Sequence, residues 1–165
     1  MKSNHYTHSL YYKLLIGYLI FGLLGFITIA TISSEMTYHH LVERESEVLY
    51  DEATMIADRC SKAYEGKTIN LDSAYPQIEA VSTYLQSDIW ILNHEGTIVA
   101  DSSDSRTGIA IDDFDPTAQG NRLYSIGQYY NLFDSKVLSV SAPITGNMKT
   151  YGYIVIHMPI QNIEA

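Results

Sequence analysis

Eight side chains in the C-terminal half of the sequence are of types that bind small polar molecules. They are Arg106, Arg122, Tyr124, Tyr130, Ser139, Ser141, Tyr153 and His157. Each can form hydrogen bonds, and a guanidinium can hold a carboxylate through two parallel hydrogen bonds. The two arginines stand at the two ends of a long polar segment. These residues therefore indicate a binding site for a small molecule, although the same residues could simply fill and solvate a sheet.

The sequence contains no comparable signal for catalysis or for a metal site. It has no phosphate-binding loop, no Gly-Xaa-Ser-Xaa-Gly motif and no His-Glu-Xaa-Xaa-His motif. No helical pair of histidines stands at ligand spacing with an acidic third partner. Five acidic residues between Asp101 and Asp115 could attract a divalent cation, but turn and cap chemistry explains them better. We expect no catalytic residue, metal or cofactor in this chain.

The composition predicts one packed domain with some additional length. The chain has 165 residues, of which 46% are hydrophobic and 18% charged. A net charge of −9 argues against a nucleic-acid partner, because phosphate binding requires a basic surface. The single cysteine, Cys60, excludes an internal disulfide and a cysteine-based zinc site, and is expected to be a buried helical residue.

Residues 14–33 are predicted to form a transmembrane anchor. No charged residue occurs in this apolar stretch, which is long enough to cross the hydrocarbon core of a bilayer. Tyr11, Tyr12 and Tyr18 lie where an interfacial aromatic belt would begin. A cleaved signal peptide is the alternative, but its apolar region would be shorter and would end in a small-residue cleavage site.

The flanking charges predict the orientation of this anchor. Lys2 and Lys13 precede the span, the first charge after it is Glu35, and the next basic residue is Arg44. The positive-inside rule then places residues 1–13 in the cytoplasm and residues from 34 onward outside the membrane.

A long amphipathic helix is expected from Glu35 to Glu65, because no proline or glycine interrupts this range. Its apolar stripe is Leu49, Ala53, Ile56, Cys60 and Ala63. A seven-residue series, Val42, Leu49, Ile56 and Ala63, would also permit a dimer through a partner helix. Packing of this stripe onto the chain's own sheet is the preferred interpretation.

Shorter elements follow this helix. A second helix is expected from Asp72 or Ser73 to Gln86, and a hairpin from strands at 89–92 and 97–100 joined by a turn at Gly96. Ser102 to Asn121 reads as a long loop, in which a short helix could start near Asp112. Three strands are predicted at 123–130, 136–144 and 151–158, before the start of a helix at 160–165.

The last two strands have two different faces. One is apolar and should lie on the long helix: Leu138, Val140, Ala142, Ile154, Ile156 and Met158. The other carries Ser139, Ser141, Tyr153 and His157. A mixed face covered by a long loop suits a small-molecule pocket, which needs apolar walls and a few converging polar groups.

Three segments carry a resemblance to a known family. They are residues 90–102 (Trp-Ile-Leu-Asn-His-Glu-Gly-Thr-Ile-Val-Ala-Asp-Ser), 138–144 (Leu-Ser-Val-Ser-Ala-Pro-Ile) and 152–160 (Gly-Tyr-Ile-Val-Ile-His-Met-Pro-Ile). With this order of elements, residues 34–160 resemble the extracytoplasmic PAS-like sensor domains called Cache or PDC domains, as found in sensor histidine kinases of Gram-positive bacteria.

This resemblance implies an α+β fold in which a long helix packs on a five-stranded antiparallel sheet of order 2-1-5-4-3. It implies a small carboxylate or amine as ligand, a homodimer through the long N-terminal helix, and signal transduction across the membrane. Family members continue into a second span and an output module, so residues 161–165 are expected to start a helix toward that span. The alternatives are the sensor of a chemoreceptor or cyclase, and a membrane-anchored interaction domain without a small ligand.

Overall fold

A computed structural model describes residues 5–62, 64–65, 68–69, 71–116 and 124–163. The chain divides into two compact units, Met1–His40 and Leu41–Ala165. Its first helix, α1 (His5–Lys62), contributes residues to both units. The sequence predicted a span at 14–33 and a long helix from Glu35 that is continuous, or nearly so, with it, and α1 includes both as one unbroken helix up to Lys62. No proline occurs within it and no glycine after Gly25, so nothing interrupts the backbone hydrogen bonds.

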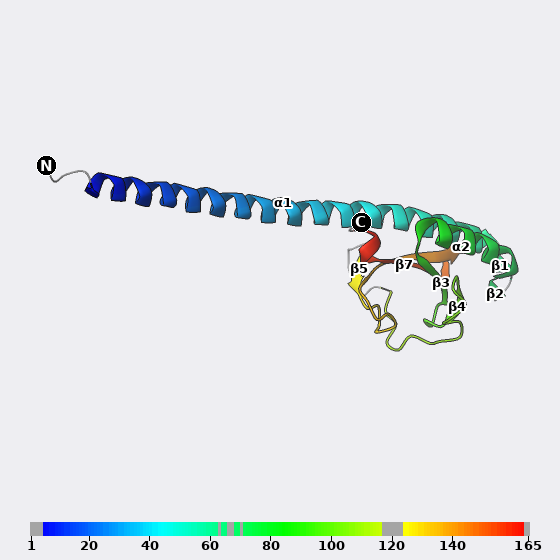
Figure 1. Cartoon of the computed structure of the whole chain (residues 1–165). Helices are drawn as coiled ribbons and strands as arrows, with labels where there is room; N and C mark the ends of the chain where they lie inside the picture. Colours follow the sequence, from blue (N-terminus) through cyan, green and yellow to red (C-terminus); the bar gives the residue numbers. More distant parts are fainter. Residues whose placement is uncertain (1–4, 63, 66–67, 70, 117–123, 164–165) are drawn as a thin grey trace. The chain divides into compact units, whose positions relative to one another are not determined.

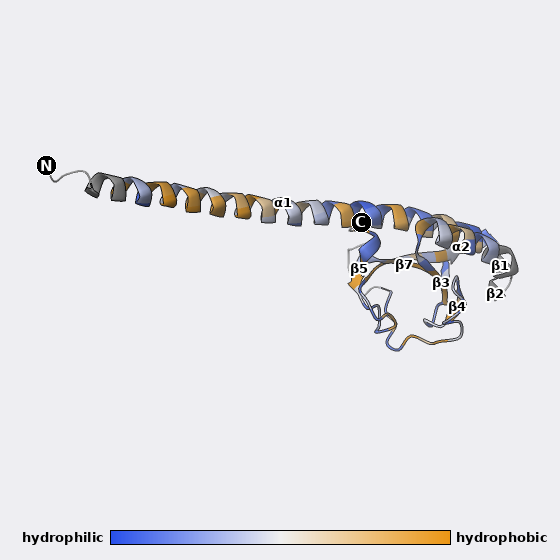
Figure 2. Ribbon diagram, in the orientation of Figure 1, coloured by the Kyte–Doolittle hydropathy of each residue, from blue (hydrophilic) through white to orange (hydrophobic). Residues whose placement is uncertain are grey.

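The first unit consists of the apolar part of α1. This is the one helix in the described chain that is long and apolar enough to cross a membrane, and Figure 2 shows its hydrophobic run. The hydroxyls of Thr28 and Thr31 donate hydrogen bonds of 2.8 Å to the carbonyls of Leu24 and Ile27. Both polar groups are therefore satisfied inside the helix, as a lipid environment requires.

In the second unit, the remaining turns of α1 lie along one face of the main sheet (Figure 1). Val42, Leu49 and Ile56 are buried there, which confirms that this stripe packs within the chain. Cys60 is also buried, as predicted, and burial raises the pKa of its thiol to about 11. Ala63 lies outside the described residues.

The segment after α1 differs from the prediction. The helix ends at Lys62 instead of Glu65, because Tyr64–Glu65 (β1) pairs with Thr68–Ile69 (β2) in a small antiparallel sheet. The second helix, α2 (Leu71–Leu85), occupies the predicted range. It ends before Gln86, whose φ of 50° is the left-handed conformation typical of a helix C-terminus.

The main sheet has five antiparallel strands, as predicted. They are β3 (Asp88–Asn93), β4 (Ile98–Asp101), β5 (Tyr124–Gly127), β6 (Val137–Gly146) and β7 (Lys149–Pro159). Their spatial order is β4-β3-β7-β6-β5, which is 2-1-5-4-3 in order of appearance. Its register pairs Trp90 with Val155 and Ser139 with His157.

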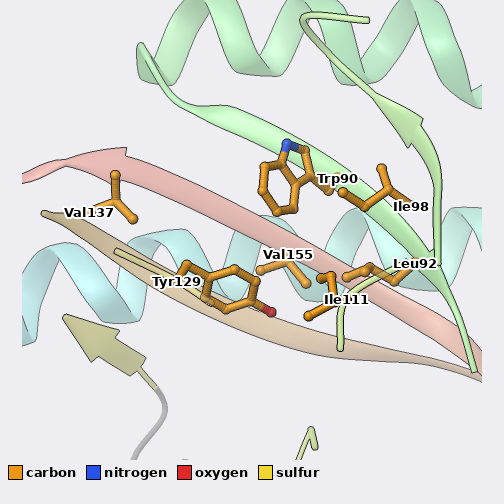
Figure 3. Packing of buried hydrophobic residues seen from close by; sticks show 7 residues of the cluster. All are labelled: Trp90, Leu92, Ile98, Ile111, Tyr129, Val137 and Val155. Carbon is orange, nitrogen blue, oxygen red and sulfur yellow. The ribbon is translucent and has the colours of Figure 1, made fainter. Parts of the chain in front are cut away.

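Alternation along the strands produces the two predicted faces. Ile154 and Ile156 are buried and alternate with Val155 along β7, so they lie on the face toward α1, and the opposite face carries a second cluster with Val155 (Figure 3). This cluster consists of Trp90, Leu92, Ile98, Ile111, Tyr129, Val137 and Val155. Figure 3 shows these side chains in front of the strands, with α1 behind them.

Residues 102–116 are irregular but are tied to the sheet. The amide of Ile98 donates to the carbonyl of Ile109 at 2.8 Å, and Thr97 forms a β-bridge with Ala110. These bonds cover the outer edge of β4. The short helix considered near Asp112 is not formed in the described residues 112–116, which make turns, with Asp113 at φ 53°.

The C-terminal elements also differ from expectation in length. β5 ends at Gly127, whereas the predicted strand ran to residue 130. The chain instead turns through residues 128–132. After β7, Ile160–Asn162 forms a short 3-10 helix, and residues 164–165 of the helix start predicted at 160–165 lie outside the described residues.

Candidate functional site

A cavity of about 660 Å³ opens on the sheet face that does not carry α1. Its size falls within the range of small-molecule sites. It is lined by Phe114, Asp115, Pro116, Tyr124, Ser125, Ile126, Gly127, Tyr129, Tyr130 and Ser141. The wall therefore comes from β5, the turn that follows it, the irregular residues 102–116 (here called the covering segment) and one residue of β6.

The turn after β5 has an unusual backbone that presents two of these aromatic rings. Tyr129, Tyr130 and Asn131 have φ values of 35°, 52° and 59°. The left-handed region costs an ordinary L-residue roughly 1–2 kcal/mol, so three in succession need support from the fold. Hydrogen bonds from the amides of Leu132 and Phe133 to the carbonyl of Gln128 close the turn at 3.1 and 3.2 Å.

Phe114 forms part of the cavity wall opposite this turn. Its ring packs over Gly96, where a Cβ atom would lie only 2.5 Å from Phe114 Cβ. Gly96 has φ 87°, so the hairpin turn and this close approach both require glycine. The Phe114 ring also meets Tyr153 at 5.4 Å and Tyr130 at 6.3 Å between centroids. The amide of Asp115 donates to the Tyr130 hydroxyl at 3.2 Å, which joins the covering segment to the turn.

Next to the cavity lies a closed group of side chains around His157, here called the histidine cluster (His157, Ser139, Trp90, Tyr129, Phe133 and Arg106). His157 is fully buried, and its Nδ1 shares a hydrogen bond of 2.8 Å with Ser139 Oγ. The rings of Trp90, Tyr129 and Phe133 surround it at centroid distances of 4.2, 4.4 and 4.9 Å. Burial, with a smaller effect of Arg106, holds the pKa of His157 well below its usual range. The imidazole is therefore neutral at physiological pH.

Arg106 covers this cluster. Its guanidinium lies 4.8 Å from the ring centre of Phe133 and 5.6 Å from that of Trp90. One guanidinium nitrogen donates to the carbonyl of Leu132 at 3.3 Å, and the other to Ser105 Oγ at 3.1 Å. The positive charge of Arg106 therefore interacts with aromatic rings and hydrogen-bond acceptors of the same chain.

Asp101 sets the position of Arg106. Its buried carboxylate accepts hydrogen bonds from the amides of Ser103, Ser105 and Arg106 at 3.0, 3.2 and 2.9 Å. The hydroxyls of both serines also donate to it. Turn chemistry therefore accounts for this carboxylate, in line with the interpretation of the acidic segment from the sequence.

The structure divides the eight predicted site residues into groups. Tyr124, Tyr130 and Ser141 line the cavity together. Arg106, Ser139 and His157 belong to the histidine cluster, and Tyr153 packs against Phe114. Arg122 lies outside the described residues.

Seven of the ten residues that line the cavity were not identified from the sequence, and Phe114 and Tyr129 are the two that shape it most. Phe114 falls in the segment that was interpreted as a loop. Its contact with Gly96 joins two distant parts of the sequence, so no local sequence pattern indicates it. Tyr129 was assigned to a strand, and alternation would have placed it on the face opposite Tyr130. One available signal for the end of the strand is Gly127, because the residues after it do not alternate between polar and apolar types.

Comparisons with known proteins identify the fold. No protein-family model matches this sequence, and no curated protein matches it. Among solved structures, the ligand-binding domain of the Campylobacter jejuni chemoreceptor Tlp3 in complex with 4-methylisoleucine superposes with a TM-score of 0.55. It shares 12% sequence identity, and the match covers 78% of this chain and 57% of that one. The sensory domain of the same receptor gives a TM-score of 0.54 at 13% identity, over 78% of this chain and 60% of that one.

A weaker likeness, with a TM-score of 0.44, is to the sensor domain of the V. cholerae histidine kinase DctB. It has 16% identity and covers 93% of this chain and 59% of that one. This chain thus spans about 57–60% of the length of these domains. It shares the fold of the chemoreceptor sensory domains.

Proposed function

We propose that this chain is the ligand-sensing part of a membrane-bound receptor. The cavity on the sheet face away from α1 carries this proposal. An interaction domain without a small ligand would be expected to have this face filled by the covering segment. Here residues 102–116 of the segment pack Ile111 and Phe114 against the sheet, and the described residues leave a space of about 660 Å³. The fold shared with a chemoreceptor's ligand-binding domain supports the same function.

The receptor is proposed to be a sensor histidine kinase. The motifs at 90–102, 138–144 and 152–160 support this output, and the likeness to Tlp3 favours a chemoreceptor as the second candidate. Sequencing the gene beyond the codon for Ala165 tests both. We expect a second apolar span followed by a kinase core. A methyl-accepting coiled coil would favour the chemoreceptor, and an immediate stop codon would exclude an output in the same chain.

Residues 14–33 are proposed to anchor the chain, with residues 34–160 outside the membrane and 1–13 in the cytoplasm. The lysines at positions 2 and 13 support this orientation. A membrane-impermeant maleimide should label Glu47→Cys in intact cells, in a Cys60→Ser background. Ser9→Cys should be labelled only after lysis. The reverse pattern would contradict the orientation.

A homodimer through α1 is also proposed, on a different face from the one the sequence indicated. Leu41, Val48 and Met55 recur every seven residues and are 39%, 44% and 47% exposed. Val42 and Leu49 are buried within the chain, so they are not available to a partner. A seven-residue apolar repeat on an exposed helix face is the pattern of a two-helix seam.

Cysteine cross-linking tests this seam. In a Cys60→Ser background, Val48→Cys should form a disulfide between two chains under mild oxidation, since the paired Cα atoms would lie close enough. Glu47→Cys is exposed but lies on a different part of the helix, and serves as the matched control. Equal cross-linking of both variants would argue against the seam.

Because α1 includes both the proposed anchor and the helix packed on the sheet, it can carry a signal. A ligand that binds one sheet–helix arrangement more tightly shifts the equilibrium toward that arrangement. The change would then reach the anchor along α1.

A thermal-shift screen tests the sensing function itself. The full chain in detergent micelles would be screened against amino acids, small carboxylates and amines. At least one compound should raise the Tm, since a ligand that binds only the folded state stabilises it. Ser141→Trp places an indole at the cavity wall and should abolish the shift, whereas Thr54→Trp, on the exposed side of α1, should preserve it. A screen in which nothing binds would favour an interaction domain.

A further inference from the structure

The imidazole of His157 is enclosed in a way that suits only its neutral form. The ring is fully buried, and its Nδ1 shares a hydrogen bond of 2.8 Å with the hydroxyl of Ser139. Its Nε2 is also buried and has no hydrogen-bond partner among the described residues. A neutral imidazole carries one N–H, whereas a protonated one carries two. Proton uptake in this conformation would therefore leave a charged N–H buried without an acceptor, which is strongly unfavourable.

The titratable groups around the imidazole do not compensate for this cost. Arg106, from the covering segment, lies over two of the rings that contact His157, and its positive charge opposes a second one there. Tyr129, from the turn after β5, is buried, which raises its pKa and keeps its phenol neutral. Asp88, on β3, is half-buried and paired with His157 in the register of the sheet. Burial raises the pKa of this carboxyl, Asp101 adds to the rise, and Arg106 opposes it.

Two segments cover the histidine cluster, and both also form the wall of the cavity. The covering segment supplies Arg106 to the cluster and Phe114 to the cavity. The turn after β5 supplies Phe133 to the cluster and Tyr130 to the cavity, while Tyr129 belongs to both. The guanidinium of Arg106 joins the two segments, because it donates to a carbonyl of this turn at 3.3 Å. A change in the cluster therefore reaches the cavity wall directly.

The turn after β5 is held in a conformation that its residues do not prefer. Tyr129, Tyr130 and Asn131 have left-handed φ values, which are unfavourable for residues with a Cβ atom. Two contacts with Trp90 support the turn. The ring of Phe133 stacks on the indole at 5.3 Å, and that of Tyr129 meets its edge at 5.9 Å. Once such contacts are lost, the turn can relieve its strain by moving.

We propose that the histidine cluster is a pH-sensitive switch in the wall of the cavity. When His157 takes up a proton from solvent, Arg106 and residues 128–133 move away from the sheet, so that both N–H groups of the imidazolium reach water. The wall then loses its closed arrangement at Tyr129 and Tyr130. The switch is a property of the fold. Its use, which is to make ligand binding depend on the surrounding pH, rests on the proposed function.

Trp90 reports on the cluster directly, because it is the only tryptophan of the chain and its ring lies 4.2 Å from that of His157 between centroids. The full chain in detergent micelles would be titrated from about pH 7.5 to about pH 4.5. Quenching of the Trp90 fluorescence by acrylamide should increase severalfold below about pH 6.5, while the far-UV circular dichroism stays unchanged. If both signals change together, His157 gains its proton only when the whole domain unfolds, and the switch is overturned.

Hydrogen exchange locates the opening. The amides of Arg106, Leu132 and Phe133 donate hydrogen bonds of 2.9, 3.1 and 3.2 Å. Their protection factors should fall by up to about tenfold per pH unit below about pH 6.5, because the opening is linked to the uptake of one proton. The amides of β3 should keep their protection. Constant protection of the turn over the whole pH range would contradict the proposal.

Variants assign the response to one group. His157→Gln keeps a hydrogen-bonding side chain that does not titrate, and should remove both the quenching and the exchange response. His94→Gln, at an exposed position, should keep both, and so should Asp88→Asn. Loss of the response in Asp88→Asn would assign it to that carboxyl and overturn the role of His157.

Nuclear magnetic resonance of histidine-labelled protein gives the same answer in the unmodified chain, should His157→Gln not fold. The imidazole of His157 should gain its proton over the pH range in which quenching increases, and a ring that stays neutral throughout overturns the switch. None of these measurements needs a ligand. A chain that opens in acid but binds no compound in the thermal-shift screen keeps the switch and loses the sensing function. A chain that binds a compound without opening keeps the sensing function and loses the switch.

Discussion

The histidine cluster and the cavity share Tyr129 but use polar groups in opposite ways. In the cluster, the side chains face one another: the buried Ser139 and His157 share a hydrogen bond, and the half-buried Arg106 stacks on aromatic rings. In the cavity, Tyr124 and Ser141 are half-buried, Tyr130 is exposed, and all three line an open space. Polar residues on one sheet face can thus serve stability at one end and recognition at the other. The difference arises from what covers them.

The largest expected effect comes from breaking the cluster. His157→Ala removes a buried ring that contacts three aromatic neighbours and leaves Ser139 without its partner. We expect a loss of about 3 kcal/mol in the free energy of unfolding, measured by urea denaturation. His94→Ala, at an exposed position, should change it by less than about 0.5 kcal/mol. A small effect of His157→Ala would mean that the cluster is not the stabilising region.

A second prediction concerns pH. Because the pKa of His157 is lower in the folded state than in the unfolded chain, the unfolded chain binds the extra proton first. The contribution of His157 to the free energy of unfolding is therefore complete above about pH 6.5. It is lost as the pH falls below that value, by up to about 1.4 kcal/mol per pH unit. Urea denaturation between pH 7.5 and 5.5 measures this slope. The pKa of Asp88 is raised, chiefly by burial, which gives the opposite trend, but at more acidic pH.

His157→Gln should flatten this slope, because glutamine does not titrate. If the variant keeps the full pH dependence, the effect belongs to another group.

The smallest expected effect comes from relieving strain in the turn between β6 and β7, in comparison with the turn after β5. Met148, at the turn between β6 and β7, has φ 61° and is fully exposed. Met148→Gly creates an Asn-Gly turn and should stabilise the chain by about 1 kcal/mol, measured as an increase in the urea midpoint. Met148→Ala should give no gain, because alanine keeps the strain. Ligand binding should be unchanged in both, whereas Asn131→Gly, next to Tyr130, should alter it.

Much of the fold could be predicted because its signals are local. Alternation at Ser139, Val140, Ser141 and Ala142 gives the faces of β6, and the turn at Gly96 gives the first hairpin. The residues of the site were harder to predict from the sequence. The left-handed backbone at Tyr129 and Tyr130 contradicts the preference of tyrosine, and is maintained by contacts with Phe114 and His157 that come from distant segments. A tertiary contact of this kind has no local pattern.

The same limit applies to Arg106. The sequence places it at one end of a long loop. The carboxylate of Asp101 holds its backbone amide, and contacts with Leu132 and Phe133 hold its guanidinium. The pairing of β1 with β2 was also missed, because strands of two residues are too short to show a period.

The position of β3, between β4 and the last strand β7, has a consequence for folding kinetics. β3 pairs with β7 along its whole length, from Asp88 with His157 to Asn93 with Gly152, although the two strands are separated by almost all of the sheet-forming sequence. Such non-local pairing slows folding, because a long loop must close before the contacts form. During synthesis the hairpin of β3 and β4 emerges first and has to wait for the last strand with an apolar edge exposed. The domain is therefore expected to fold only after β7 has left the ribosome, and to need protection from aggregation until then.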